Sequence, residues 1–140
     1  MNRSSAAAQS FGGDDFARLL EFRDGLRRFL HWSDQQAKAA GLTAAQHQLL
    51  LAIRGHPGLP SVRDVATHLL LRHHSAVELV DRAERAGLVR RVPDGEDQRV
   101  VRLELTGEGD ACLAELAAAH LEELSRLRPS FDVLWRHLPG

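Results

Sequence analysis

Residues 73–82, which read HHSAVELVDR, combine hydrogen-bonding and charged side chains in a pattern that suits contact with nucleic-acid bases. Helical spacing places the apolar residues Ala76, Leu79, Val80 and Ala83 on one stripe. The remaining surface carries His73, His74, Ser75, Val77, Glu78 and Arg82. In the major groove a hydroxyl can bond a base edge, a valine can pack on a thymine methyl, and a carboxylate can accept from cytosine N4. This segment is therefore a candidate for base contacts.

The same residues have simpler interpretations, which the pattern leaves open. His73 and His74 can also cap the start of a helix or stand in solvent. Glu78 is unfavourable beside phosphates unless Arg82, four residues later, neutralises it or a base amino group pairs with it. In residues 61–105 eight Arg are balanced by eight Asp or Glu, so a basic surface must arise from placement.

A second candidate contact lies in the segment PDGEDQR, residues 93–99. A carboxylate two residues before an arginine can hold the guanidinium in bidentate geometry, so Asp97 can orient Arg99 for a narrow minor groove. The alternative is a solvated ion pair of a hairpin. Arg91 can bind phosphate or brace the hairpin, while Arg90 and Arg102 are further cations on it.

The elements around these residues follow from local signals. Ser61 and Asp64 form a capping box for a short helix, whose free amides, with Arg63, can hold a phosphate. A turn is expected at 70–72, a second helix over 73–86, and Gly87 as its C-terminal cap. The segments LVRRV and RVVRLEL then alternate as two strands. Helix, turn, helix and hairpin is the order of a winged helix-turn-helix, and hence double-stranded DNA is the expected partner.

The outer segments are predicted to be helical. Residues 14–40 carry an apolar helical stripe that Gly41 ends, and residues 1–13 are expected to fray. Thr43 and Gln46 form a capping box for a helix that ends at 55–58. Thr106 caps a long helix, which Pro129 is expected to break, and residues 130–138 are expected to form a last short helix.

Several motifs along the chain together resemble the MarR family of bacterial transcriptional regulators, over roughly residues 14–128. They are Leu42-Thr43-x-x-Gln46, Val77 to Arg82, Gly87-Leu88-Val89-x-Arg91, Asp97-x-Arg99 and Leu105-Thr106-x-x-Gly109. The resemblance implies a mainly α single domain over 1–140, with dimerisation helices at 14–41 and 106–140 and a winged helix-turn-helix with a small β-hairpin at 42–105. It implies a homodimer formed by the termini. The candidates for that interface are Phe16, Leu19, Phe131, Leu134 and Trp135, although Trp135 can instead pack on its own chain.

The resemblance also implies a binding site for small anionic aromatic compounds between the dimerisation helices and the winged part. Its candidate residues are Phe29, Trp32, His47 and His120. At each histidine the alternative is a core residue with satisfied hydrogen bonds. The eight His show no metal-ligand spacing, so no metal or other cofactor is predicted. Cys112 is the only thiol, and the chain has no Tyr to orient a peroxide at it.

Composition limits the remaining classes. The formal net charge is −1, and the chain shows no run of 18 apolar residues and no basic-then-apolar leader, so we expect a cytoplasmic protein without a membrane partner. Nucleophile-elbow, P-loop, dinucleotide and H-E-x-x-H motifs are missing from the sequence, which argues against an enzyme. The sequence favours a homodimeric repressor that an organic acid releases from an inverted-repeat operator. A redox- or metal-responsive regulator, or a winged helix that binds only proteins, stays open.

Overall fold

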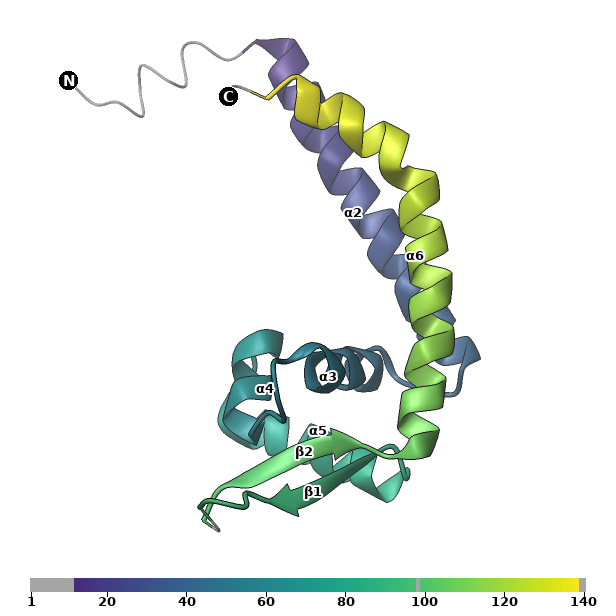
Figure 1. The fold of residues 1–140 in the computed structure, drawn as a ribbon. Helices are drawn as coiled ribbons and strands as arrows, with labels where there is room; N and C mark the ends of the chain where they lie inside the picture. Colours follow the sequence, from purple (N-terminus) through teal and green to yellow (C-terminus); the bar gives the residue numbers. More distant parts are fainter. Residues whose placement is uncertain (1–11, 98, 139–140) are drawn as a thin grey trace, which may run out of the picture.

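A computed structural model describes residues 12–97 and 99–138. Two long helices, α2 (Gly13–Ala39) and α6 (Gly107–Arg136), run side by side as a stalk, and the elements between them form a winged module at its base (Figure 1). The module contains α3 (Ala44–Gly55), α4 (Val62–Leu69), α5 (His73–Arg85), β1 (Val89–Pro93) and β2 (Val101–Leu105). The predicted mainly helical winged helix-turn-helix fold is confirmed.

The helix starts follow the predicted capping boxes. The Thr43 hydroxyl accepts from the Gln46 amide at 3.0 Å, and the Ser61 hydroxyl accepts from the Asp64 amide at 3.1 Å. The first stalk helix begins at Gly13, one residue before the predicted start, and the frayed segment expected before it lies outside the described residues except for Gly12 and Gly13. At the other end Gly41 has a φ of +84°, which a residue without a side chain adopts readily.

The helix-turn-helix has the predicted turn. Leu70 adopts a φ of 55°, a left-handed conformation that reverses the chain after α4, and the amide of Leu71 then bonds the carbonyl of Ala66 at 2.9 Å. Gly87, with a φ of +76°, ends α5 and leads directly into β1. The antiparallel hairpin pairs Val89 with Leu105 and Pro93 with Val101.

The expected break at Pro129 is wrong, because α6 continues as one helix to Arg136. Proline removes only one helical hydrogen bond, and the residue four positions earlier, Ser125, is exposed, as is Pro129 itself. Water can therefore satisfy the carbonyl that loses its partner. Packing also holds the last turns, since the ring of Phe131 meets that of Phe22 edge to face at 6.1 Å.

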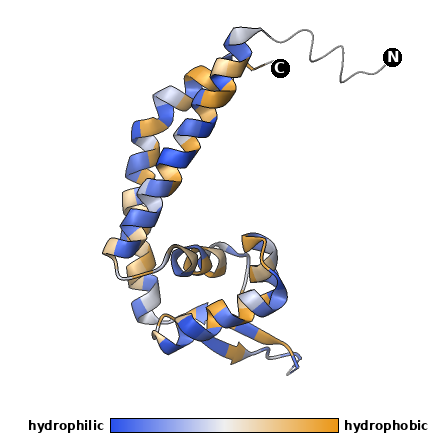
Figure 2. Ribbon diagram, turned by 180° about the vertical axis from the view of Figure 1, so that it is seen from behind, coloured by the Kyte–Doolittle hydropathy of each residue, from blue (hydrophilic) through white to orange (hydrophobic). Residues whose placement is uncertain are grey.

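The apolar core lies in the winged module and at its junction with the stalk. Its most buried large side chains are Leu49, Leu50, Val65, Val80, Val89 and Leu103. By contrast, large apolar side chains on both stalk helices stay exposed, and hydrophobic and hydrophilic residues alternate along that part of the molecule (Figure 2). The core thus fixes the module, while the stalk keeps an uncovered apolar surface.

Candidate nucleic-acid interface

Helix α5 presents its polar face to solvent, as its periodicity predicted. Ala76, Val80 and Ala83 are fully buried and Leu79 nearly so. The exposed residues of this face are His73, His74, Glu78 and Arg82, while Ser75 and Val77 are half-buried at its edges. Arg72 occupies the N-cap position without a side-chain cap bond, so neither histidine caps the helix. The face is available for contact with a groove.

Arg91 braces the wing against α5. Its guanidinium bonds Glu84 Oε1 at 2.8 Å and Asp81 Oδ1 at 2.7 Å, and its amide donates to Glu84 Oε2 at 3.3 Å. Of the two roles that the sequence left open for Arg91, the geometry therefore favours bracing. Among the described residues Glu78 and Arg82 form no ion pair with each other, whereas Asp81 and Glu84 of the same helix both pair with Arg91 of β1.

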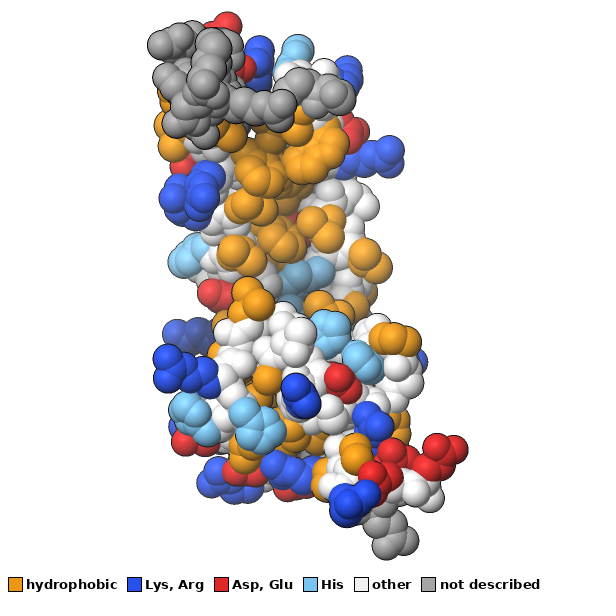
Figure 3. Space-filling view, turned by 90° about the vertical axis from the view of Figure 1, so that its left-hand side faces the viewer, with side chains coloured by type: hydrophobic (Ala, Val, Ile, Leu, Met, Phe, Trp, Pro, Cys, Tyr) orange, Lys and Arg blue, Asp and Glu red, His pale blue; other side chains and the backbone are white. Residues whose placement is uncertain are grey.

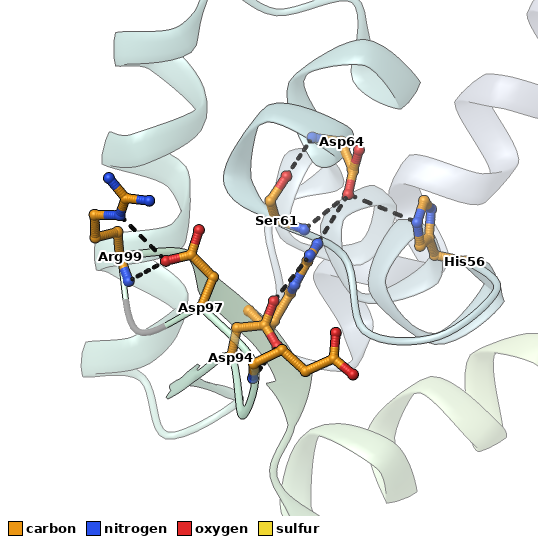
Figure 4. Close-up of polar contacts among 8 residues, drawn as sticks. His56, Ser61, Asp64, Asp94, Asp97 and Arg99 are labelled. Carbon is orange, nitrogen blue, oxygen red and sulfur yellow. Dashed lines mark hydrogen bonds and ion pairs between the residues drawn. The ribbon is translucent and has the colours of Figure 1, made fainter.

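At the tip of the wing, Asp97 holds Arg99 through a single oxygen. Asp97 Oδ1 accepts from the Arg99 amide at 3.1 Å and from its Nε at 3.3 Å (Figure 4). The expected bidentate pairing of carboxylate and guanidinium is therefore wrong, because the two residues are too close in sequence and the backbone amide takes part. The Arg99 side chain is 92% exposed, so its guanidinium projects from the tip of the wing. Asp97 holds the backbone amide and Nε of the same residue.

Arg102 ties the wing to the start of α4, a role that sequence reasoning missed. Its guanidinium lies 3.3 Å from Asp94 Oδ2 and 3.8 Å from Asp64 Oδ2. The Ser61 amide donates to Asp64 at 2.9 Å, and this bond is the largest cause of the lowered pKa of the Asp64 carboxyl. The sequence indicated this role of Arg102 only by placing a cation on a hairpin strand whose turn carries acidic residues.

The same capping box changes the phosphate clamp expected at the start of α4. The amides of Ser61 and Asp64 are both occupied within the box, and the Asp64 carboxylate adds a negative charge at this end of the helix. The exposed Arg63 is left as the contact candidate of this helix end.

The four predicted effector residues meet where the stalk joins the winged module. His120 is the centre: its ring centroid lies 4.8 Å from that of Trp32, 4.8 Å from that of His47 and 5.9 Å from that of Phe29. Its Nδ1 lies 2.7 Å from the Leu116 carbonyl and therefore carries the hydrogen, so the Ser33 hydroxyl, 2.7 Å from Nε2, donates to that nitrogen. The rings pack directly against one another, and an entering ligand has to separate them.

The pKa values of His47 and Cys112 are both shifted from their usual values. Burial, and secondarily His120, lowers the pKa of His47 from its usual 6.5, while Asp34 opposes the change. This shift favours the neutral form of the buried His47. Burial, followed by Glu115 and Glu108, raises the pKa of the Cys112 thiol, which disfavours the reactive thiolate.

The predicted dimer residues lie toward the free end of the stalk. Leu19, Leu134 and Trp135 line one cleft together with Phe22, and Phe131 lines the neighbouring one. Trp135 does contact its own chain, with its ring 5.7 Å from that of Phe22, yet it is 60% exposed. Phe16 and Leu19 are 63% and 58% exposed. Figure 3 shows hydrophobic side chains gathered on one face of this part of the stalk.

In residues 12–97 and 99–138, no group of three or more His, Cys, Asp or Glu is arranged to hold a metal ion. No helix in the same ranges has both the length and the apolar character required to span a membrane.

The sequence is similar to those of known proteins. The sequence model of the MarR family matches residues 40–100. The chain is 31% identical over 83 residues to the HTH-type transcriptional regulator PecS of Dickeya dadantii, covering 58% of this chain and 50% of PecS. It is 30% identical over 86 residues to the HTH-type transcriptional repressor MdtR of Bacillus subtilis, covering 61% of this chain and 55% of MdtR. The matches thus span about half of each relative.

A solved structure extends the likeness to the stalk. Bordetella bronchiseptica BpsR, whose DNA binding is regulated by 6-hydroxynicotinic acid, has a TM-score of 0.61 with this chain at 24% identity, covering 82% of this chain and 87% of that one. The exposed α5 face and the braced wing define a winged helix-turn-helix protein. Residues 40–100 thus match the MarR family, and the two relatives, both HTH-type transcriptional regulators, are similar to part of this chain.

Proposed function

We propose that this chain is a homodimeric repressor that binds an inverted-repeat operator and is released by a small organic anion. The observation that carries the proposal is the outward polar face of α5, beside a wing that Arg91 and Arg102 fasten at its base. The face offers base contacts through Ser75 and His74, and the wing tip offers a guanidinium to a second groove. In this proposal residues 42–105 bind DNA and the stalk helices dimerise.

The uncovered apolar side chains of the stalk support the dimer. They lie on both helices and are Leu19, Leu20 and Leu30 on α2 and Leu121, Val133 and Trp135 on α6. An exposed apolar surface on this scale is typical of a protein–protein interface. A second copy related by a two-fold axis would cover it and present two α5 helices to DNA, so the operator should be an inverted repeat.

The junction of stalk and module supports control by a small anion. A ligand that enters between Trp32, His47 and His120 would move the stalk relative to the winged module, and with it the spacing of the two α5 helices. An anion can accept a hydrogen bond from an imidazole N–H there, and BpsR, of the same fold, responds to an aromatic acid. A tenfold preference of the ligand for the form that does not fit DNA would weaken binding by about 1.4 kcal/mol.

Binding to the DNA upstream of its own gene, measured by fluorescence anisotropy over a range of salt concentrations, tests the DNA part. We expect Arg99→Ala to weaken binding to many sequences and to flatten the salt dependence by about one phosphate equivalent or less. Arg90→Ala is the matched control, because Arg90 lies on the same hairpin but pairs with Glu104. Ser75→Ala and His74→Ala should change base preference at particular positions by about 1–3 kcal/mol. Equal, sequence-independent losses from Arg99→Ala, Ser75→Ala and His74→Ala would refute this division of roles.

A titration of salicylate-like acids into the protein–DNA complex tests the effector part. The acids should release the DNA from the wild-type protein and act more weakly on His120→Gln. Peroxide should leave the complex intact, because the pKa of the Cys112 thiol is raised. If peroxide releases the wild-type protein but not Cys112→Ser, while the acids have no effect, Cys112 is the sensor and the anion proposal is wrong.

A further inference from the structure

His56 and His68 form a pair outside the junction and outside the α5 face. His56 follows the last residue of α3, and His68 lies in the last turn of α4. Their rings stand 5.2 Å apart with planes at 82°, and His56 Nδ1 lies 3.0 Å from His68 Nε2. Twelve residues separate them, so their proximity depends on how α4 folds back on α3.

The second nitrogen of His56 faces a carboxylate. Nε2 of His56 lies 3.7 Å from Asp64 Oδ2 (Figure 4). Asp64 is itself held by the Ser61 amide and shared with Arg102, so its position is fixed from the wing side. The 3.7 Å separation is longer than a hydrogen bond. If the His56 ring turned toward a bound ion and closed this gap, the carboxylate would orient the imidazole and raise its basicity, as it does for metal-binding histidines.

The distance between the two nitrogens also suits a shared cation. Two ligands at about 2.0–2.1 Å from zinc stand about 3.3 Å apart at a tetrahedral angle and about 3.0 Å apart at an angle near 94°. The observed 3.0 Å thus requires the rings to turn but not the helices to move. The pair lies on an open cleft that Gln48, Leu51 and Leu69 also line, so water or a further oxygen can complete the coordination.

We propose that His56 Nδ1 and His68 Nε2 bind one divalent late transition-metal ion, of which Zn²⁺ is the probe. Two protein ligands make a weaker site than a structural zinc centre, which agrees with the lack of a larger cluster among the described residues. Imidazole ligands favour Cu²⁺ over Zn²⁺ and reject Mg²⁺. Asp64 is a positioning residue, and the ion would join the end of α3 to α4 beside the wing.

A Zn²⁺ titration of the full chain without an affinity tag, in competition with a chromophoric chelator, tests the site without DNA, so its result is independent of the proposed function. We expect one Zn²⁺ per chain, at least tenfold weaker binding in His56→Gln and in His68→Gln, and no further loss in the double variant. His31→Gln and His137→Gln, which change exposed stalk histidines, are the matched controls and should bind as wild type. Asp64→Asn should weaken binding about 10–100-fold.

Electron paramagnetic resonance of the Cu²⁺-loaded protein identifies the ligands directly. The spectrum should show coupling to two imidazole nitrogens in the wild type and to fewer in each single variant. Thermal melting of each variant identifies any that fail to fold. Wild-type affinity in His56→Gln or His68→Gln, equal losses in the controls, or equal binding of Mg²⁺ would show that the two rings share only a hydrogen bond and would overturn the proposal.

Discussion

At Gly109 the stalk lies against the backbone of the winged module, so Gly109→Ala should be destabilising. A Cβ there would stand 2.1 Å from the Leu88 carbonyl oxygen and 3.0 Å from its carbon. That oxygen cannot easily retreat, because it accepts from the Thr106 amide at 3.0 Å. The Thr106 hydroxyl in turn donates to the Gly87 carbonyl and accepts from the Gly109 amide, which locks the start of α6 to the end of α5.

The size of the loss follows from three terms. Forcing a methyl group into a packed site costs about 1–3 kcal/mol, occasionally more. The hydrogen bond between Thr106 and Leu88, if broken, adds about 1 kcal/mol. Replacing glycine by alanine in a helix returns about 0.8–1 kcal/mol. The net loss in free energy of unfolding should therefore be about 1–3 kcal/mol.

Urea unfolding, followed by circular dichroism at one fixed chain concentration, measures this loss. The matched control is Gly107→Ala, two residues earlier in the same helix, where an added Cβ meets nothing within 4 Å. That variant should be neutral or more stable than wild type. If Gly109→Ala is as stable as Gly107→Ala, the close contact between α6 and Leu88 does not exist in solution, and the rigid joint described above is refuted.

Three further changes test other parts of the account. His47→Phe should flatten the pH dependence of the free energy of unfolding. The pKa of His47 is lowered from 6.5 in the folded protein, so the unfolded chain binds more protons as the pH falls below 6.5. The wild-type protein should therefore lose stability in that range. Equal slopes of unfolding free energy between pH 7 and 5 would contradict this. Pro129→Ala should raise the melting temperature, since it restores a helical hydrogen bond at an exposed position, and a lower melting temperature would mean that the proline is required. Deletion of residues 129–140 should weaken the dimer in sedimentation, and a monomeric full-length protein at micromolar concentration would exclude the interface.

The elements could be predicted because their signals are local. Capping boxes act over three residues, and the glycines at 41 and 87 end their helices by backbone conformation alone, so Ser61 and Thr43 gave the correct helix starts. Pro129 misled because the carbonyl that loses its partner is open to water and because Phe131, two residues later, packs on α2. That packing depends on a residue more than 100 positions away, which periodicity cannot show.

The candidate site was predictable only in part for the same reason. The buried stripe of α5 defined its outward face without further information. The ion pairs of Arg91 and Arg102 join residues seven to 38 positions apart, so the sequence left the role of the first open and missed that of the second. The meeting of Trp32, His47 and His120 came from family resemblance, because nothing in their spacing places them together. The Asp97–Arg99 geometry was mistaken because spacing does not show that the backbone amide competes for the carboxylate.

Selection of binding sites by the wild-type protein from a pool of random duplex DNA tests the central claim most directly. If two α5 helices read DNA from a two-fold dimer, the selected sequences should converge on an inverted repeat with half-site centres about one helical turn apart. Arg99→Ala should select the same repeat with weaker binding, while Ser75→Ala should alter particular positions in each half. A selected pool without a repeat, or one no tighter than the starting pool, would contradict the assignment of α5 and the wing as the DNA-binding surface.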